Sequence, residues 1–287
     1  MDTLFSDYFL PVTLAIITMG MGLSLTEKDF RNILVQPKAI VTGIFSQIVI
    51  LPAIAFFVAS LTNLDPVFKV GLVIIAACPG GATSNLITYI LTGNIALSIS
   101  MTAVNSLITL ITIPFIVSLG LEAFIQQSTE INLPIGDTIL KIFFITIVPA
   151  FTGTRIRKWK TEFADKLEKP LKIILPLLLL VVYMGVIFID QGTEQATRKD
   201  FLSLIPSTLS LNFAAMLAGW MIARIMNLGK RNRFTIAIEV GLQNSALAIF
   251  VSSFLLKNQS MALVAVVYGS FTFFTTLLFG WIIKKIS

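Results

Sequence analysis

The chain has 287 residues, of which 56% are hydrophobic and only 13% are charged. Because a soluble domain carries about 25% charged residues, this composition excludes an ordinary soluble protein and predicts a bundle of membrane-spanning helices. The net charge of +6 does not indicate nucleic-acid binding, since the basic residues stand in short segments between apolar stretches. The chain has no His and a single cysteine, Cys78, which excludes imidazole chemistry and an internal disulfide.

Nine stretches are long and apolar enough for a spanning helix, which needs about 20 residues. In chain order they are residues 8–26, 39–61, 67–91, 94–119, 135–156, 170–190, 204–226, 233–256 and 260–284. The connections are short, and none has the composition of a linker or a soluble domain. We therefore predict an all-α polytopic membrane protein with nine transmembrane helices in a single domain, residues 1–287. No basic region with a cleavage site opens the sequence, so we expect residue 1 to be the mature start.

The basic residues divide unevenly between the two membrane sides that nine spans would create. Sixteen of the 21 lie on the side of the C-terminus. The five on the other side are Lys69, Lys141, Arg198, Lys199 and Lys257. Because basic loops stay in the cytoplasm, we expect the N-terminus outside and the C-terminus in the cytoplasm. The expected location is the plasma membrane, the inner membrane of a bacterial cell, with several crossings.

Two of the predicted spans contain interruptions. In the third span, Pro79 removes a backbone donor, and Gly80 and Gly81 add backbone freedom. In the eighth span, polar residues follow Gly241 in the middle of the apolar stretch. Unwound backbone at membrane depth must be buried by protein or line a cavity. One break in each half of the chain predicts an inverted repeat with two broken crossing helices, a design of secondary transporters.

Glu239 lies just before the second interruption and is the most informative residue of the chain. An ionisable group at bilayer depth costs several kcal/mol unless something pairs with it, so it indicates a functional site. We expect no basic residue of the same helix to neutralise this carboxylate. Its partner is then a mobile one, either a proton or a metal cation.

Other polar residues in the spans supply neutral oxygen atoms. Ser98 and Thr102 lie four residues apart, so they share one face of the helix that follows the first break. Gln47 lies within the second span. The face of Ser98 is extended by Asn105, Ser106 and Thr109. Hard cations prefer oxygen ligands. One carboxylate among neutral oxygens suits a monovalent ion, and Na⁺ is the biological candidate.

Several segments carry longer motifs. They read Cys78-Pro79-Gly80-Gly81-Ala82-Thr83-Ser84-Asn85, Thr92-Gly93-Asn94-Ile95-Ala96-Leu97-Ser98, Glu239-Val240-Gly241-Leu242-Gln243-Asn244-Ser245 and Met19-Gly20-Met21-Gly22-Leu23. These segments resemble the signature segments of the bile acid:sodium symporter family, and the resemblance covers essentially the whole chain. It implies a panel domain, about 8–26, 135–156 and 170–190, and a core domain, about 39–119 and 204–284. Many bacterial members have ten spans, and this chain resembles those that lack the first.

The resemblance also implies two Na⁺ sites that share Glu239. The first would use the side chains of Ser84, Asn85, Ser98, Thr102 and Glu239. The second would use the side chains of Gln47, Glu239 and Gln243 with the main-chain carbonyls of Val240 and Leu242. The solute would bind beside the crossover, near Thr83, Asn85, Asn244 and, from the last span, Thr272.

One segment departs from the family pattern. Members often carry a Trp-His-Asn-like segment in the last helix, near the solute. In its place this chain reads Tyr268-Gly269-Ser270-Phe271-Thr272-Phe273-Phe274-Thr275-Thr276. Because the His and Asn are absent, the solute of a relative does not transfer to this chain.

These features predict a sodium-coupled symporter, not an enzyme, that imports an organic anion (a bile acid or a smaller carboxylate) by alternating access. Two alternatives stay open: a proton-coupled organic anion carrier with Glu239 as proton site, and a metalloid exporter of related fold with Cys78 as thiolate ligand. An intramembrane enzyme finds little chemistry here, because the chain has no His and one deep carboxylate. The expected partners are two Na⁺ ions, the organic anion and the lipid bilayer, with neither nucleic acid nor an obligatory protein partner.

Overall fold

The structure of the protein is a computed structural model that describes residues 4–24, 35–125, 135–188 and 198–286. These four parts of the chain are helical and contain no β-strand. In chain order the elements are η1 (Phe5–Phe9), α2 (Leu10–Ser24), α4 (Pro37–Phe45), η2 (Ser46–Ile50), α5 (Leu51–Leu61), α6 (Pro66–Ala77), α7 (Ala82–Ile90), α8 (Ile95–Ile125), α9 (Ile135–Ile142), η3 (Phe143–Ile147), α10 (Val148–Trp159), α11 (Thr161–Phe188), α12 (Arg198–Ile225), α13 (Lys230–Gly241), α14 (Ser245–Ile249), η4 (Phe250–Leu255) and α15 (Gln259–Ile286).

Seven helices of the described chain are long and apolar enough to cross a membrane, which confirms the all-α polytopic class. They are Phe5–Leu23, Pro37–Leu61, Ile95–Ile125, Gly136–Trp159, Lys199–Ile225, Lys230–Leu255 and Gln259–Ile283. The predicted count of nine is not confirmed. The third predicted span is divided into the short helices α6 and α7, and the apolar part of α11, Ile173–Phe188, is also short. The predicted span ends at residues 26 and 190 lie outside the described residues.

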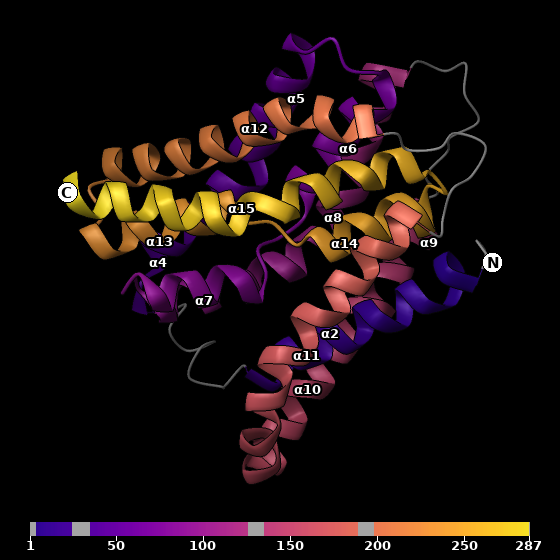
Figure 1. Ribbon diagram of the computed structural model, residues 1–287. Helices are drawn as coiled ribbons and strands as arrows, with labels where there is room; N and C mark the ends of the chain where they lie inside the picture. The colour runs from indigo at the N-terminus through magenta and orange to yellow at the C-terminus, as the bar shows by residue number, and fades with distance from the viewer. Residues whose placement is uncertain (1–3, 25–34, 126–134, 189–197, 287) are drawn as a thin grey trace.

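The helices α2, α10 and α11 pack against one another and run at an angle to α12, α13 and α15 (Figure 1). Glycines bring α2 and α10 into backbone contact. A Cβ at Gly22 would collide with the carbonyl oxygen of Ala150, and a Cβ at Gly153 with that of Met19. Small residues allow this close approach between membrane helices. The segment from Met19 to Leu23 therefore serves helix packing.

The two interruptions predicted from the sequence are present, and they contact each other. Residues 78–81 separate α6 from α7, and residues 242–244 separate α13 from α14. The N–H of Asn244 donates to the carbonyl oxygen of Pro79 at 2.8 Å. Backbone groups at broken helix ends have no partner within their own helix, so they are available for such a bond. This hydrogen bond joins the two breaks directly at the crossover of the broken helices.

Proline explains a wide, π-helical turn in the second span. Pro52 has no N–H, so the carbonyl four residues earlier lacks its usual partner and the turn before it widens. In η2 the N–H of Leu51 donates to the carbonyl of Ser46, five residues back. The turns η1 and η3 likewise precede Pro11 and Pro149. Gln47 lies in η2 and is buried, so this proline sets the place of one predicted ligand.

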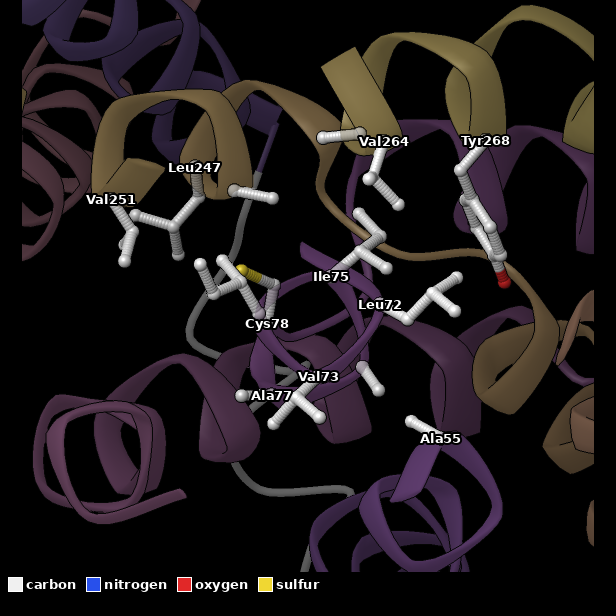
Figure 2. Packing of buried hydrophobic residues seen from close by; sticks show 14 of the residues in the cluster. Ala55, Leu72, Val73, Ile75, Ala77, Cys78, Leu247, Val251, Val264 and Tyr268 are labelled. Atoms are coloured by element: carbon white, nitrogen blue, oxygen red, sulfur yellow. The ribbon is translucent and has the colours of Figure 1, made fainter. Parts of the chain in front are cut away.

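Apolar side chains surround the first break. Figure 2 shows Cys78 close to Ala77, Val73, Leu247 and Val251, and Cys78 is only 1% exposed. A buried free thiol of this kind packs as a small apolar side chain. Across the described residues, no three His, Cys, Asp or Glu side chains come together as a metal site. Cys78 therefore belongs to no such three-ligand group in the part of the chain that the structure describes.

Amide side chains from three distant segments meet at one end of the molecule. Asn94 Nδ2 donates to Gln36 Oε1 at 3.0 Å and to Asn232 Oδ1 at 2.8 Å, and Asn232 Nδ2 donates to Gln36 Oε1 at 3.0 Å. The turn before α8 contains Thr92 in the left-handed region, with φ of 61°. The cluster ties together the starts of α4, α8 and α13. The N- and C-termini lie on opposite sides of the molecule (Figure 1).

Candidate functional site

Glu239 lies in the last turn of α13, next to the second break, and its exposure is 0%. The span that carries it, Lys230–Leu255, is 94% buried over its most apolar stretch, whereas the span Gly136–Trp159 is 17% buried. Protein rather than lipid therefore surrounds this carboxylate. A buried charge needs partners that hydrogen-bond it or neutralise it.

Hydroxyl groups surround the Glu239 carboxylate. Thr102 Oγ1 donates to Oε2 at 3.0 Å and Ser98 Oγ donates to Oε1, while Ser84, whose hydroxyl donates to the carbonyl oxygen of Gly81 at 2.8 Å, also interacts with the carboxylate. Ser98 also lies 2.7 Å from Asn85 Oδ1. We call the carboxylate with Ser84, Asn85, Ser98 and Thr102 the first oxygen cluster. The structure brings together all five side chains predicted for the first Na⁺ site.

The helix of Glu239 does contain basic residues, because α13 begins at Lys230 and its first turn also contains Arg231 and Arg233. These residues precede Glu239 by about 1.7 to 2.5 helical turns. Arg231 donates to the carbonyl of Thr92, and Arg233 to that of Leu228. Within the described parts of the chain, no basic side chain forms an ion pair with Glu239. The carboxylate is therefore without a fixed counter-charge there.

Gly80 leaves space beside the carboxylate. A Cβ at this position would lie 2.6 Å from Glu239 Oε2, 3.3 Å from Ser84 Oγ and 3.5 Å from the carbonyl oxygen of Leu242. Three oxygen atoms from both breaks therefore converge on the volume that a side chain here would fill. The carbonyl of Leu242, predicted for the second Na⁺ site, lies on the side of the first oxygen cluster.

In the first oxygen cluster, the single hydroxyl proton of Ser98 faces two acceptors. A serine hydroxyl has one proton. Ser98 Oγ lies within hydrogen-bonding distance of both Asn85 Oδ1 and Glu239 Oε1, and only one of them can receive that proton at a time. A cation among these oxygens would remove the conflict, because oxygen lone pairs are what hard cations bind. The donor set fits Na⁺.

A second oxygen cluster lies on the main-chain side of Glu239. Gln47 Nε2 donates to the carbonyl oxygen of Glu239 at 3.2 Å and to Gln243 Oε1 at 3.3 Å. Gln243 Nε2 donates to the carbonyl oxygens of Val240 at 2.7 Å and Glu239 at 3.3 Å. Gln47 Oε1 is buried and has no hydrogen-bond partner among the described residues. An unpaired acceptor beside two carbonyls also suits a cation.

The residues predicted for the solute divide into two groups. Asn85 and Asn244 are half-buried near the crossover, and Thr83 is exposed on the same break. Asn244 Oδ1 accepts from the N–H of Leu247 and so caps α14. Thr272 is 3% exposed on α15 and shares no hydrogen bond, in the described chain, with the other three residues. Thr83, Asn85 and Asn244 thus lie at or beside the two breaks, and Thr272 lies within α15.

The sequence analysis missed one hydrogen-bond network beside the second break. Tyr268 Oη and Asn212 Nδ2 each donate to the carbonyl oxygen of Gly241 at 2.7 Å, and Thr275 Oγ1 donates to Asn212 Oδ1 at 2.7 Å. Tyr268 and Asn212 are both fully buried. The network fixes the last carbonyl before the break. An asparagine in the middle of an apolar span was the signal available in the sequence.

Comparison with known proteins adds to this geometry. The family model of the sodium bile acid symporter family matches residues 11–198, which include the first break and the helix that carries Ser98. The chain belongs to the sodium bile acid symporter family. The family resemblance inferred from the sequence is confirmed.

Individual relatives of this symporter-family chain are transporters. The probable sodium/metabolite cotransporter BASS1, chloroplastic, of Arabidopsis thaliana is 30% identical over 247 residues, which cover 84% of this chain and 58% of the relative. The uncharacterized sodium-dependent transporter YocS of Bacillus subtilis is 29% identical over 243 residues, 83% of this chain and 72% of the relative. Sodium/bile acid cotransporter 4 of Mus musculus is 28% identical over 243 residues, 83% of this chain and 54% of the relative.

The matched region is a little over half the length of the plant and mouse relatives. Family and relatives agree on one point, which is sodium-dependent transport across a membrane. The chain is thus a multi-pass membrane protein of a transporter family and not a member of an enzyme family.

Proposed function

We propose that this protein is a sodium-coupled symporter that imports an organic anion by alternating access. The observation that carries the proposal is the buried Glu239 carboxylate, which has hydroxyl donors but no basic partner in the described chain. A proton binds to one acceptor, so proton binding would not explain why several other oxygen atoms converge on the same place. A sodium ion uses several oxygens at once. The membership in a sodium-dependent family supports the same choice.

Two Na⁺ ions are proposed as cargo. The first would bind in the first oxygen cluster, with Ser84, Asn85, Ser98, Thr102 and the Glu239 carboxylate as ligands. The second would bind at Gln47 and Gln243 with nearby main-chain carbonyls. The buried, unpaired Gln47 Oε1 supports the second position. The carbonyl oxygen of Leu242 lies near the same Gly80 position as Glu239 Oε2, so we assign this carbonyl to the first ion rather than the second.

The proposed solute is an anion because of the local charge. Two Na⁺ ions beside one carboxylate leave a net charge of +1 in a buried region. The helix α7 begins at Ala82, directly after the first break and without a side-chain cap, and the partial positive charge of a helix start favours an anion. Thr83 is exposed and Asn85 half-buried at this start, so they are the first candidates for solute contact. Bile acids and smaller carboxylates both carry the charge required.

The transport movement is proposed to occur between two groups of helices. The panel would contain α2, α10 and α11, which pack together, and the core would contain the two broken helices. The hydrogen bond from Asn244 to Pro79 joins the breaks, so they would move as one unit. Movement of this unit against the panel would expose the site to one side and then the other. The proposed location is the plasma membrane, with the N-terminus outside.

The test is the thermal stability of the purified protein in Na⁺, K⁺ and choline at several pH values. A ligand that binds only the folded state at 100 times its Kd stabilises it by about 2.7 kcal/mol. We expect a rise specific to Na⁺ that Glu239→Gln abolishes. Glu122→Gln, which alters an exposed carboxylate at the far end of α8, is the matched control and should keep the rise.

Two outcomes would overturn the proposal. One is stabilisation that follows pH and ignores Na⁺, which would indicate proton coupling at Glu239. The other is Na⁺-driven uptake that survives in the Glu239→Ala variant. With Na⁺ binding established, a screen of small carboxylates and bile acids for further stabilisation identifies the solute, since solute and Na⁺ must tighten each other's binding by the same factor.

A further inference from the structure

The helix α8 carries a stripe of polar side chains that begins at the first oxygen cluster and continues beyond it. Successive members are three or four residues apart, so at 3.6 residues per turn they fall within an arc of about 80° and extend over about 21 Å. The members of this α8 stripe are Ser98, Thr102, Asn105, Thr109 and Thr112. The first two contact Glu239, and the proposed sodium sites make no use of the last three.

The α8 stripe faces the interior of the protein. Ser98 and Asn105 are fully buried, and Thr109 is 3% exposed. The opposite side of the helix presents Leu107 and Ile111, which are 51% and 68% exposed. A membrane helix thus turns its apolar side outward and its polar side toward α6, α13 and α4, against which it packs.

The burial of the Asn105 amide is not explained by the fold or by the proposed sodium sites. Neither its Oδ1 nor its Nδ2 has a hydrogen-bond partner in the described chain, and Thr112 Oγ1 also lacks one. Ser106 and Thr109, by contrast, donate to carbonyls of their own helix. An unpaired buried amide is unfavourable, because it loses its hydrogen bonds to water without replacing them. Water can both donate to Asn105 Oδ1 and accept from Asn105 Nδ2. Asn105 lies one helical turn from Thr102.

The same face of α8 changes character toward its Ile125 end. Ile116 is buried, and a Cβ at Gly120 would lie 3.1 Å from Val73 of α6. Both positions fall within the arc of the stripe. Apolar side chains in close contact exclude water, and such constrictions close ion pathways. The stripe therefore ends in an apolar seal in this conformation.

We propose that the α8 stripe is a hydrated pathway along which Na⁺ reaches Glu239 from the membrane side at which α8 ends. Asn105 and Thr109 bind water and the passing ion between the seal and the first oxygen cluster. The pathway opens when α8 and α6 separate at Gly120. This inference rests on the proposed sodium coupling. It adds a route for Na⁺ and the residues Asn105, Thr109 and Thr112.

The experiment measures water access through engineered thiols. In a Cys78→Ala background, which contains no other cysteine, the variants Asn105→Cys, Thr109→Cys, Leu107→Cys and Ile111→Cys are placed in nanodiscs. Each is treated with a cationic, water-soluble methanethiosulfonate, which reacts with the thiolate formed in contact with water. We expect Asn105→Cys and Thr109→Cys to react at least about tenfold faster than the two lipid-facing controls. Na⁺ should slow the reaction at Asn105→Cys, and choline should not.

Equal rates at all four positions would overturn the pathway, and so would fast labelling that Na⁺ does not affect. The Na⁺-dependent thermal rise is measured on the same four variants. If the rise persists while Asn105→Cys and Thr109→Cys react no faster than the controls, the pathway is wrong and sodium coupling stands. If the parent chain shows no rise, sodium coupling itself has failed. Because two stripe positions are tested, the experiment still gives a result if one of the two variants misfolds.

Discussion

The two helix breaks meet at one point but contribute different things to it. The first break is built from Pro79, Gly80 and Gly81 and offers space and backbone. The second brings the Glu239 carboxylate and polar side chains, and its Gly241 carbonyl is held by Tyr268 and Asn212. Small residues of one break thus face fixed ligands of the other. The proposed cation site needs both, because the first break supplies a position without a side chain at Gly80 and the second supplies the charge.

The largest expected effect comes from closing that space. Gly80→Ala places a Cβ 2.6 Å from Glu239 Oε2, among the oxygens of the first cluster. Na⁺ affinity should fall about 100-fold, or about 2.8 kcal/mol of binding free energy. The measurement is the Na⁺ concentration that gives half of the thermal shift.

Gly81→Ala is the matched control for this change. Its Cβ would meet no atom closer than Asn244 Cβ at 4.0 Å, and neither glycine has a positive φ. We expect near-normal Na⁺ affinity. Equal losses in both variants would mean that the break merely needs flexible backbone, and the account of Gly80 would fail.

The next largest effect concerns the second oxygen cluster. Gln47→Leu removes the unpaired Oε1 and the donor to the Glu239 carbonyl. We expect about tenfold weaker Na⁺ binding, or about 1.4 kcal/mol. The adjacent Ser46→Ala removes a hydroxyl that donates only to its own helix, at Thr42, and should leave Na⁺ binding unchanged. Unaltered binding in Gln47→Leu would remove the case for a second ion.

A smaller effect is expected where the second break is held in place. Tyr268→Phe removes one of two hydrogen bonds to the Gly241 carbonyl, which is worth about 1 kcal/mol. The unfolding temperature and the Na⁺ affinity should both fall modestly. Tyr89→Phe, at an exposed tyrosine, is the control. If the Tyr268 variant loses stability without any change in Na⁺ affinity, the network supports the fold alone.

The smallest effect is expected at the first break's cysteine. Cys78 is packed among apolar side chains, so Cys78→Ala should cost about 1 kcal/mol of stability and leave Na⁺ binding intact. Uptake assays on this variant check the expectation. Loss of uptake with a preserved fold would revive a thiolate role at this position.

Local chemistry made much of the site predictable from the sequence. Proline and paired glycines mark the first break, and a carboxylate in an apolar run marks Glu239, because both violate what a membrane helix tolerates. The four-residue spacing of Ser98 and Thr102 placed them on one face, where the structure has them. Those signals are contained within single segments.

What the sequence left out depends on contacts between segments. The hydrogen bond from Asn244 to Pro79 and the network at Gly241 join residues far apart in the chain, and no spacing reveals them. The segment around Gly22 matched a family motif, yet only the contact with α10 shows that it packs helices. The count of nine spans is not confirmed, because the third span is divided into two short helices and the apolar part of α11 is also short. Thr272 was placed near the solute by position in the last span, which carries no information on its contacts.

Glu239 gives its carboxylate to one oxygen cluster and its own main-chain carbonyl to the other. In the proposed two-ion mechanism, an ion that orders one cluster would restrict the torsion angles of a residue that the second ion also needs. Loading would then be cooperative, with a Hill coefficient above one, and a carrier holding a single ion would be an incompletely assembled intermediate. Such an arrangement would limit the uncoupled leak of sodium down its gradient, because a carrier with one ion would not reach the form that is transported.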